Sequence, residues 1–374
     1  MENTYIRNGQ GDTKATEEEL HALIRNSQSD ADSFILKDFT IKDLDAATIA
    51  AFKTIVISRY PNKEYEKRTD EEFLRELGFY RLDRKTQLYY PTQGCLLFFG
   101  KYNSIKDVFP SFHLDFFDYR GSTSRWIDRV ASDEPNNIEM NIFNFFNIVY
   151  NKLLAADSNH FALNDNLMRI EHSLMTALRE ALVNSLVHAD YRSTSVPIRI
   201  EIHDDYFLFK NPGKMLVSIQ EFENGGNTIC RNSIVMQGFR ATGFAERQGM
   251  GGKEIISVAM NNKLMLPTIN TNLMFTELKF WKIDAASYPD LSDDEQKILR
   301  LILNSNHPIS KKEIEQNFSS LSERKIRSSL EKLIKTEKII STGKARATKY
   351  IINPTSTEFK WMLNKLISQL KDNF

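Results

Sequence analysis

The sequence predicts a multidomain protein of the α+β class. Its 374 residues are enough for two or three domains with separate cores, and an apolar content of 41% is ordinary for a folded chain. Helical and strand periodicities alternate through residues 166–285, whereas residues 291–353 are typical of three helices and a hairpin. We therefore expect five segments, and they cover residues 1–30, 31–165, 166–285, 291–353 and 356–374.

The composition excludes several classes of protein. The net charge is zero, so affinity for nucleic acid must come from a local patch. Cys95 and Cys230 are the only cysteines, which excludes a disulfide scaffold and a cysteine-rich zinc site. No signal peptide opens the chain, and no apolar stretch reaches the roughly 18 residues of a membrane span. We expect a cytoplasmic protein without a membrane partner.

The first segment, residues 1–30, contains a strand at 4–9 and a helix at 17–25. Thr16 and Glu19 form a capping-box pattern at the start of that helix. One strand and one helix cannot form a core, so we expect them to pack on the following domain or on a partner.

Residues 31–165 are expected to form a connecting domain. Helices are predicted at 40–57 and 70–77, followed by the segment 87–94 and the apolar run 95–100, in which Cys95 should be buried. This helix–helix–strand pattern is reminiscent of a small winged-helix-like unit. A strand with alternating aromatic residues follows at 108–119; these rings could form sheet core or a base-stacking platform, and the alternation favours sheet core. A long apolar helix is predicted at 138–154.

Residues 179–191 are the most informative stretch of the chain. Apolar residues recur with helical spacing, and Glu180, Asn184 and His188 lie four residues apart on another stripe of the same helix. The alternative is a solvated helix face with a salt-bridging glutamate.

The following segments predict a sheet and a loop that could bind an anion. Residues 197–203 and 206–209 alternate as strands, and Pro212 and Gly213 should break the sheet in the segment 210–215. The glycine-rich segment 246–253 opens a helix at 254–260, and exposed amides at a helix N-terminus attract anions. A plain turn into a helix is the alternative. A closing strand is predicted at 273–281.

This order of elements resembles the GHKL ATPase fold shared by gyrase and histidine kinases. It is most similar to the divergent branch in bacterial RecG-like transcriptional regulators, where the region follows a Schlafen-type AlbA domain. The resemblance rests on residues 179–191, the Asn-Pro-Gly of 211–213, Arg231-Asn232 and Glu246, and covers roughly residues 5–285. It implies a central GHKL-like α/β sandwich that binds ATP, and an AlbA remnant at residues 1–30.

The resemblance also assigns roles to individual residues. Glu180 matches the carboxylate that activates water, and Asn184 matches the Mg²⁺ ligand that bridges to the phosphates. Asn211 stands where the family has an aspartate that contacts the adenine amino group, and Gly213 matches a glycine that lines that pocket. Hydrolysis of a phosphoanhydride needs such a base, a metal and amide donors around the γ-phosphate.

Two further groups of residues complete the implied nucleotide site. Gly249, Gly251 and Gly252 match lid glycines whose amides face the phosphates, and Thr276 matches a hydroxyl near the adenine. The chain departs from the family at three points: Asn211 lacks the charge of the aspartate, Val187 replaces a second aspartate, and the Asn-Pro-Gly box lacks a second glycine.

The segment 291–353 predicts a winged helix-turn-helix. Helices are expected at 293–304, 310–318 and 322–335, and a hairpin at 339–352 turns at Gly343-Lys344. Residues 321–350 contain nine basic and three acidic residues, which suits contacts with DNA phosphates. The predicted contacts with double-stranded DNA are Ser322, Arg324, Lys325, Arg327, Ser328, Lys332, Lys344 and Arg346. A winged helix used for protein contacts is the alternative.

The final segment carries an apolar helical stripe at 357–374, which is buried either on its own chain or in a homodimer. Together these features predict a DNA-binding transcriptional regulator in which an ATP-binding module acts as a switch. The alternatives are a slow ATPase in DNA metabolism or phage defence, and a scaffold that binds no nucleotide. No G-x-x-x-x-G-K-[ST] motif occurs, which opposes a helicase motor.

Overall fold

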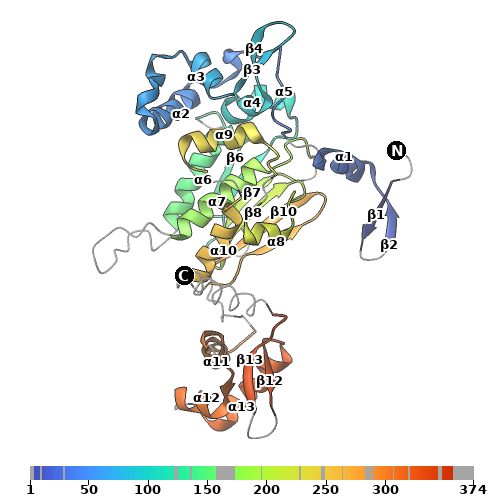
Figure 1. The fold of residues 1–374 in the computed structure, drawn as a ribbon, viewed down its shortest axis with the longest axis vertical. Coiled ribbons are helices and arrows are strands. Elements are labelled where there is room, and N and C mark those ends of the chain that lie inside the picture. Colours follow the sequence, from blue (N-terminus) through green and yellow to red (C-terminus); the bar gives the residue numbers. More distant parts are fainter. Residues whose placement is uncertain are drawn as a thin grey trace. The chain divides into compact units, whose positions relative to one another are not determined.

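The structure is a computed structural model in which two compact units are distinguished. It describes residues 4–8, 11–27, 30–121, 125–134, 137–156, 173–194, 196–226, 229–245, 249–262, 264–282, 288, 290–305, 307–318, 321–343 and 348–356. The main unit comprises Met1–Val258 and Thr268–Phe280, and the C-terminal unit comprises Ala259–Pro267 and Trp281–Phe374. Helices and strands occur in both units, so the predicted α+β class is confirmed (Figure 1).

A mixed six-stranded sheet is the centre of the main unit. Its order is β6-β5-β7-β8-β10-β9. The strands are β5 (Leu114–Asp118), β6 (Asp128–Ala131), β7 (Ile198–Ile202), β8 (Tyr206–Pro212), β9 (Thr268–Thr271) and β10 (Phe275–Trp281). β5 and β7 are parallel, whereas β5–β6, β7–β8 and β9–β10 are antiparallel. The segments on either side of the boundary expected near residue 165 therefore share one sheet.

Local sequence explains the central strands. β7 alternates as expected, with Ile198, Ile200 and Ile202 buried against the helices. β8 continues through Pro212, and the strand ends at Gly213, which has a φ of +95°, so the sheet breaks within the segment 210–215 as expected. β9 lacks a strong apolar pattern, which is why the sequence did not reveal it.

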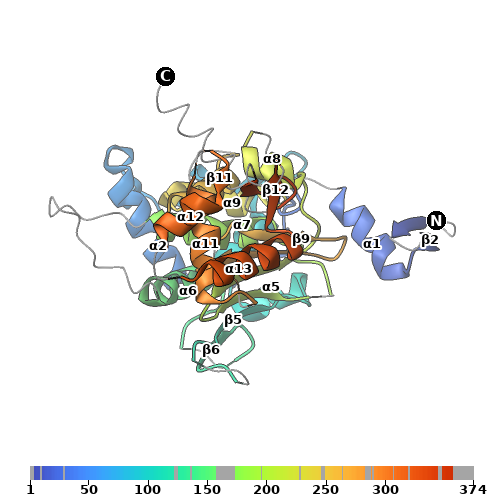
Figure 2. The ribbon, with the colours of Figure 1, turned by 90° about the horizontal axis from the view of Figure 1, so that it is seen from below.

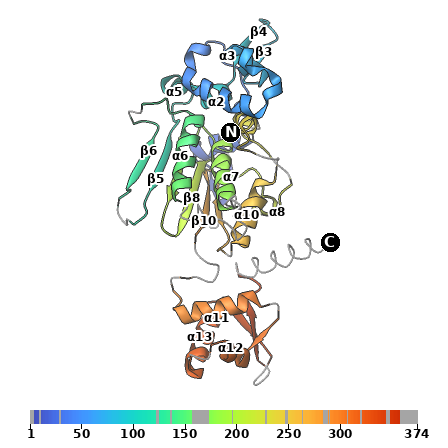
Figure 3. The same ribbon diagram turned by 90° about the vertical axis from the view of Figure 1, so that its left-hand side faces the viewer.

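Helices cover one face of this sheet. They are α6 (Ile142–Ala156), α7 (Ser173–Val187), α8 (Ile219–Asn224), α9 (Ser233–Thr242) and α10 (Gly251–Asn261). α7 packs against β7, β8 and α6, and the two long helices lie side by side in front of the strands (Figure 3). The predicted helices at 138–154 and 179–191 are thus present, with shifted ends.

Residues 35–108 form a helical region with an aromatic core. Its elements are η1 (Ile41–Asp43), α2 (Ala46–Arg59), η2 (Pro61–Lys63), η3 (Tyr65–Lys67), α3 (Asp70–Glu76), β3 (Tyr80–Asp83), β4 (Leu88–Pro91), α4 (Gln93–Phe99) and α5 (Tyr102–Val108). The strand of the helix–helix–strand pattern is present as β4 in the segment 87–94, whereas the apolar run 95–100 belongs mainly to helix α4. α4 is buried on every side, which removes the amphipathic period that would mark it as a helix.

Aromatic rings pack this region together and join it to helix α6. The Phe52 ring lies 5.6 Å from that of Phe98 and 5.6 Å from that of Phe143 in α6. In β5, Phe116 is fully buried and Phe117 nearly so. Phe116 and Phe117 are therefore sheet core, as the alternation favoured, although the strand is shorter than the predicted 108–119.

The N-terminal elements are a hairpin and a helix. They are β1 (Tyr5–Asn8), β2 (Gly11–Lys14) and α1 (Glu17–Asn26), and β1 pairs antiparallel with β2. Thr16 caps α1 in a capping box with Glu19, as predicted. The strand β2 was not anticipated.

Among its described residues from 288 to 356, the C-terminal unit has three helices and a three-stranded antiparallel sheet. Its elements are α11 (Asp293–Asn304), β11 (Ile309–Ser310), α12 (Lys311–Asn317), α13 (Glu323–Lys335), β12 (Ile339–Thr342) and β13 (Lys349–Ile352). The strand order is β11-β13-β12, and the three helices are visible together in Figure 2. The short strand β11 was not predicted. Residues 357–374, where we expected a final helix, lie outside the described residues.

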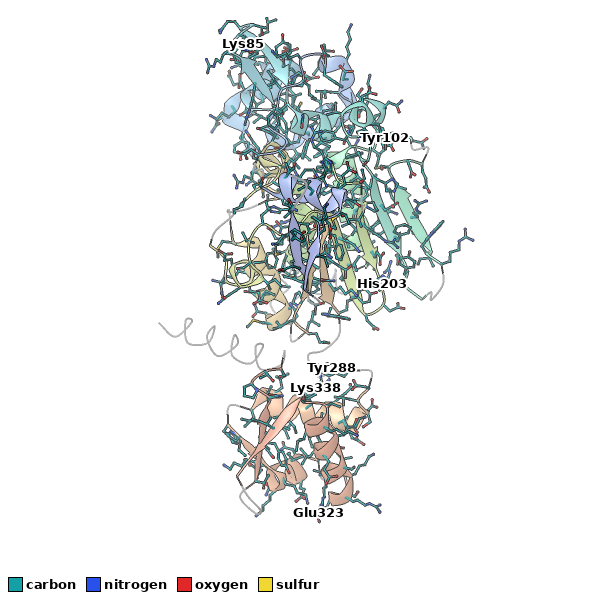
Figure 4. All side chains as sticks on the ribbon, turned by 90° about the vertical axis from the view of Figure 1, so that its right-hand side faces the viewer. Lys85, Tyr102, His203, Tyr288, Glu323 and Lys338 are labelled. Carbon is teal, nitrogen blue, oxygen red and sulfur yellow. The ribbon has the colours of Figure 1, made fainter. Side chains whose placement is uncertain are left out.

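A cation–π contact joins Tyr288, which precedes α11, to Lys338, which precedes β12. The Lys338 ammonium lies 3.4 Å from the centre of the Tyr288 ring, and the two side chains meet in Figure 4. Burial lowers the pKa of Lys338 below its usual value. In the part of the chain that the structure describes, no helix is long and apolar enough to cross a membrane.

Candidate functional site

A cavity in the main unit collects most of the predicted nucleotide residues. It has a volume of about 1040 Å³, which includes space open to solvent. Residues of α7, α8, α9, α10, β8 and β10 line it, and Figure 1 labels these elements on the ribbon. Seven of the eight predicted residues line it, namely Glu180, Asn184, Asn211, Gly249, Gly251, Gly252 and Thr276. Gly213 shapes the loop between the lining residues Asn211 and Lys214.

Helix α7 presents a carboxylate and an amide to the cavity. The Asn184 Nδ2 group donates to Glu180 Oε1 at 3.3 Å, one helical turn away. This contact turns the Asn184 amide oxygen away from Glu180. His188 continues the same row and also lines the cavity. The spacing of four residues thus predicted which side chains of α7 share one face.

His188 is neutral near pH 7. Burial lowers its pKa from 6.5 to about 4, and the nearby Arg231 guanidinium acts in the same direction. His188 therefore adds no positive charge to the cavity at neutral pH. The cationic side chains of the lining are Lys214 and Arg240.

His188 is expected to make folding sensitive to acid. Between pH 6.5 and 4 the unfolded chain binds a proton at this position and the folded chain does not, so the free energy of unfolding falls as the pH falls. The full effect is about 3 kcal/mol. Chemical denaturation of wild type and His188→Gln at pH 7 and pH 4 measures it as a change in the stability difference between them. A difference that stays constant across this range contradicts the assignment.

Wild type must be compared with His188→Gln because Asp32 also makes the stability of the fold depend on pH. Burial raises the pKa of Asp32 to about 6, although the amides of Ile234 and Val235 at the start of α9 bind its carboxylate. The folded chain therefore binds a proton here more readily than the unfolded chain, which favours folding as the pH falls through 6. This contribution opposes that of His188 and cancels when wild type is compared with His188→Gln.

Asn211, Gly213 and Thr276 form another corner of the site. Asn211 is buried, and its Nδ2 group donates to the carbonyl of Pro212 at 3.1 Å, which leaves Oδ1 as the acceptor atom of this side chain. The Thr276 hydroxyl donates to the carbonyl of Gly213 at 3.0 Å. Thr276 therefore also fixes the loop after β8.

In the glycine-rich loop, Gly251 and Gly252 are packed so closely against Glu180 and Phe222 that a larger residue would not fit without movement. A Cβ atom on Gly251 would lie 1.7 Å from Glu180 Oε1, and one on Gly252 would lie 2.2 Å from the carbonyl oxygen of Phe222. Gly249 has a φ of +80°, and its carbonyl accepts from Gly226 N at 3.1 Å. Glycine thus brings the start of α10 against Glu180 and α8. Glu246 lies outside the described residues.

The donor set suits a magnesium ion that is shared with phosphates. No group of three or more His, Cys, Asp or Glu side chains that could hold a metal occurs among the described residues. Mg²⁺ uses one or two protein oxygens and otherwise water or phosphate oxygens, so the Asn184 amide oxygen, which faces away from Glu180, fits it as a single protein ligand. The first backbone amides of α10 have no intrahelical partners and provide donors for an anion.

Several lining residues escaped the sequence analysis. They come from the segment after Gly213 and from α8 and α9, and include Lys214, Phe222, Met236 and Arg240. The apolar spacing of residues 234–239 was a usable signal for α9. Asn232, which precedes α9, donates to the carbonyls of Val187 and Ala189 at 2.9 and 2.8 Å and so closes the end of α7.

The predicted DNA contacts lie apart from this cavity in sequence, on the C-terminal unit. Ser322 caps α13, and Arg324 is exposed beside it. Lys325 pairs with Asp294, and Arg327 pairs with Glu331 at 3.0 Å.

The remaining predicted contacts differ in their accessibility to DNA. Ser328 donates to the carbonyl of Lys325, and Lys332 binds Glu295 at 2.8 Å, which makes Lys332 a weaker candidate for a phosphate contact. Lys344 and Arg346 fall outside the described residues.

Comparisons with known proteins agree with part of this assignment. The HATPase_c_4 family model, described as "Putative ATP-dependent DNA helicase recG C-terminal", matches residues 196–280 and supports an ATPase-like domain. It includes Asn211, the glycine loop and Thr276, whereas Glu180 and Asn184 precede it. A "Domain of unknown function (DUF8451)" matches residues 21–115. The chain matches no curated protein.

The fold is similar to that of solved structures. One of them is the DIP2311 protein from Corynebacterium diphtheriae, with 14% sequence identity and a TM-score of 0.51. The alignment covers 93% of this chain and 75% of that protein. At this identity the likeness concerns the fold alone.

Proposed function

We propose that the cavity of the main unit binds ATP with Mg²⁺. The observation that carries this proposal is the convergence of Glu180, Asn184, Asn211 and the glycine loop on one cavity from separate parts of the chain. Asn184 would hold Mg²⁺, and the amides at the start of α10 would bind phosphate oxygens. A bound Mg²⁺ would neutralise phosphate charge. Asn211 Oδ1 would accept from the adenine amino group.

Ligand-induced stabilisation tests this proposal. ATP that binds the folded chain alone, at 100 times its Kd, raises the free energy of unfolding by about 2.7 kcal/mol. Differential scanning calorimetry with ATP and Mg²⁺ should therefore show an upward shift in the melting temperature of the main unit. An unchanged melting temperature at millimolar ATP would remove the nucleotide assignment.

We propose further that the C-terminal unit is a winged helix that binds double-stranded DNA, which would make the protein a nucleotide-responsive transcriptional regulator. The order helix, strand, helix, helix and hairpin supports this assignment, with α13 as the recognition helix. The exposed basic side chains of α13 supply positive charge for phosphate contacts. Homodimerisation would match two half-sites.

The double variant Lys325→Ala with Arg327→Ala is expected to bind duplex DNA about tenfold more weakly than wild type at the same salt concentration. The slope of log Kd against log salt should become shallower by about two, because two phosphate contacts are lost. Fluorescence anisotropy with a labelled duplex measures both quantities. A double variant with equal charge change in the main unit, Lys42→Ala with Lys63→Ala, is the control. Equal affinity and slope in wild type and the α13 variant would exclude this contact.

A slow ATPase is the second candidate function. Glu180 favours it, because its carboxylate lies against Gly251, at the N-terminus of α10 where phosphates would bind. A carboxylate in this position can orient water and accept its proton. Phosphate release that is present in wild type and lost in Glu180→Gln, with ATP binding retained, would support hydrolysis. If neither protein releases phosphate, the nucleotide-dependent switch is the candidate function that remains.

A further inference from the structure

The loop that follows Asn211 is held by side chains from distant parts of the main unit. The Lys214 amide donates to Asn26 Oδ1 at 3.3 Å, and the Lys214 carbonyl accepts from Arg231 Nη2 at 3.0 Å. Asn26 is the last residue of α1, and Arg231 precedes α9. Both backbone polar groups of Lys214 are thus bound by residues outside its own loop.

Asn26 also binds the opposite side of this loop. Its Nδ2 group donates to the carbonyl of Leu273 at 3.2 Å, in the turn between β9 and β10. The next residue, Met274, accepts from the Gly213 amide at 2.8 Å. The Asn26 side chain therefore connects Lys214, at the end of the Asn-Pro-Gly loop, with Leu273 in the β9–β10 turn. These contacts hold the loop against that turn.

Arg231 completes the connection. It is 1% exposed, and its guanidinium donates to Asn26 Oδ1 at 2.8 Å and to the His188 carbonyl at 3.0 Å. A buried guanidinium must keep its hydrogen-bond partners, because unpaired buried charge is costly. Since a Cβ atom on Gly213 would lie 3.0 Å from Arg231 Nη2, the loop also packs directly on this side chain.

A salt bridge anchors the same end of α1. Arg25 Nε donates to Asp190 Oδ2 at 2.6 Å, and both side chains are largely buried. Asp190 N in turn donates to the Pro212 carbonyl at 2.9 Å. The last turn of α1 is thus joined to α7, to the end of β8 and to the loop that follows it.

We infer that Asn26 is a positioning residue for base recognition in the cavity, and that it acts with Arg231 to hold the Asn211–Lys214 loop in its binding conformation. This inference rests on the proposed binding of ATP. Asn26 does not line the cavity, so its effect reaches a ligand through the loop. The state of α1 consequently sets how tightly the site holds adenine.

The predicted effect is on affinity and on base preference. If loss of the Asn26 contacts leaves the loop in its binding conformation a tenth of the time, the apparent Kd for ATP rises about tenfold. Inosine triphosphate has an oxygen in place of the adenine amino group, so it gains little from Asn211 Oδ1. Asn26→Leu should therefore weaken ATP binding about tenfold and bring the ATP-to-inosine triphosphate preference close to one.

Two companion variants separate positioning from folding. Asn26→Asp keeps an oxygen that accepts from both Lys214 and Arg231, so it should bind ATP within about threefold of wild type. His21→Ala changes an exposed residue of the same helix and should bind as wild type. Circular dichroism melting should show a modest drop for Asn26→Leu, because Arg231 Nη2 loses one of its two acceptors and keeps the Lys214 carbonyl, whereas Asn26→Asp and His21→Ala should melt close to wild type.

Competition binding of ATP and inosine triphosphate to these four proteins, with Mg²⁺, decides the matter. Loss of base preference in Asn26→Leu with recovery in Asn26→Asp supports positioning. Unchanged base preference in Asn26→Leu overturns it, as does a lowered melting temperature without recovery in Asn26→Asp. If wild type itself binds neither nucleotide, the proposed function fails and this inference fails with it.

Discussion

Asn184→Ala is expected to weaken ATP binding in the presence of Mg²⁺ by about 100-fold and to leave the weaker binding without Mg²⁺ almost unchanged. In the proposed site the amide oxygen of Asn184 would be the protein ligand of Mg²⁺, and alanine cannot replace it. Alanine also favours a helix, so α7 should remain folded. Equilibrium titration of a fluorescent ATP analogue, with Mg²⁺ or with a chelator, measures both affinities.

Asn103→Ala provides the matched control for this substitution. Asn103 is an exposed residue of α5 and does not line the cavity. The Asn103→Ala variant should bind the ATP analogue as wild type does, both with Mg²⁺ and with the chelator. Equal losses of affinity for Asn184→Ala with and without Mg²⁺ would show that Asn184 does not act through the metal.

Gly251→Ala is expected to have an effect of similar size on nucleotide binding. The added Cβ atom would stand 1.7 Å from Glu180 Oε1, so either the carboxylate or the start of α10 must move. Displacement by about 1 Å at a reacting or binding group can cost about 100-fold. The affinity for ATP and any rate of phosphate release should therefore fall together.

The control for this change is Gly121→Ala. No atom lies within 4 Å of a Cβ at this position, and its φ of +66° costs only about 1 kcal/mol of backbone strain. Gly121→Ala should bind ATP as wild type does. If Gly251→Ala binds ATP normally, the close approach of Glu180 to the glycine loop is not needed for the site.

The sequence was sufficient for those parts of the site that depend on local spacing. Glu180 and Asn184 share a face because they lie one helical turn apart, and the glycine run marks a helix start that tolerates close neighbours. The strands β7 and β8 follow from alternation and from the turn at 203–205. These signals lie within a few residues of the feature that they predict.

The rest could not be predicted because it depends on contacts between distant segments. The parallel pairing of Phe116 in β5 with Ile200 in β7 leaves no mark on either strand alone. Arg231 was noticed as part of a motif, but its buried contacts with Asn26 and His188 became visible only in the structure. Helix α4 carries no helical periodicity that could identify it, because it is buried on every side.

Calorimetric titration of ATP into the wild-type protein, with and without Mg²⁺, tests the central claim most directly. We predict saturable heat with one site per chain, and an affinity at least tenfold lower when Mg²⁺ is removed. Absence of heat at millimolar ATP under both conditions would contradict the claim. The cavity would then be a feature of the fold that binds no nucleotide, and the basic helix α13 would be the part of the protein left to explain its function.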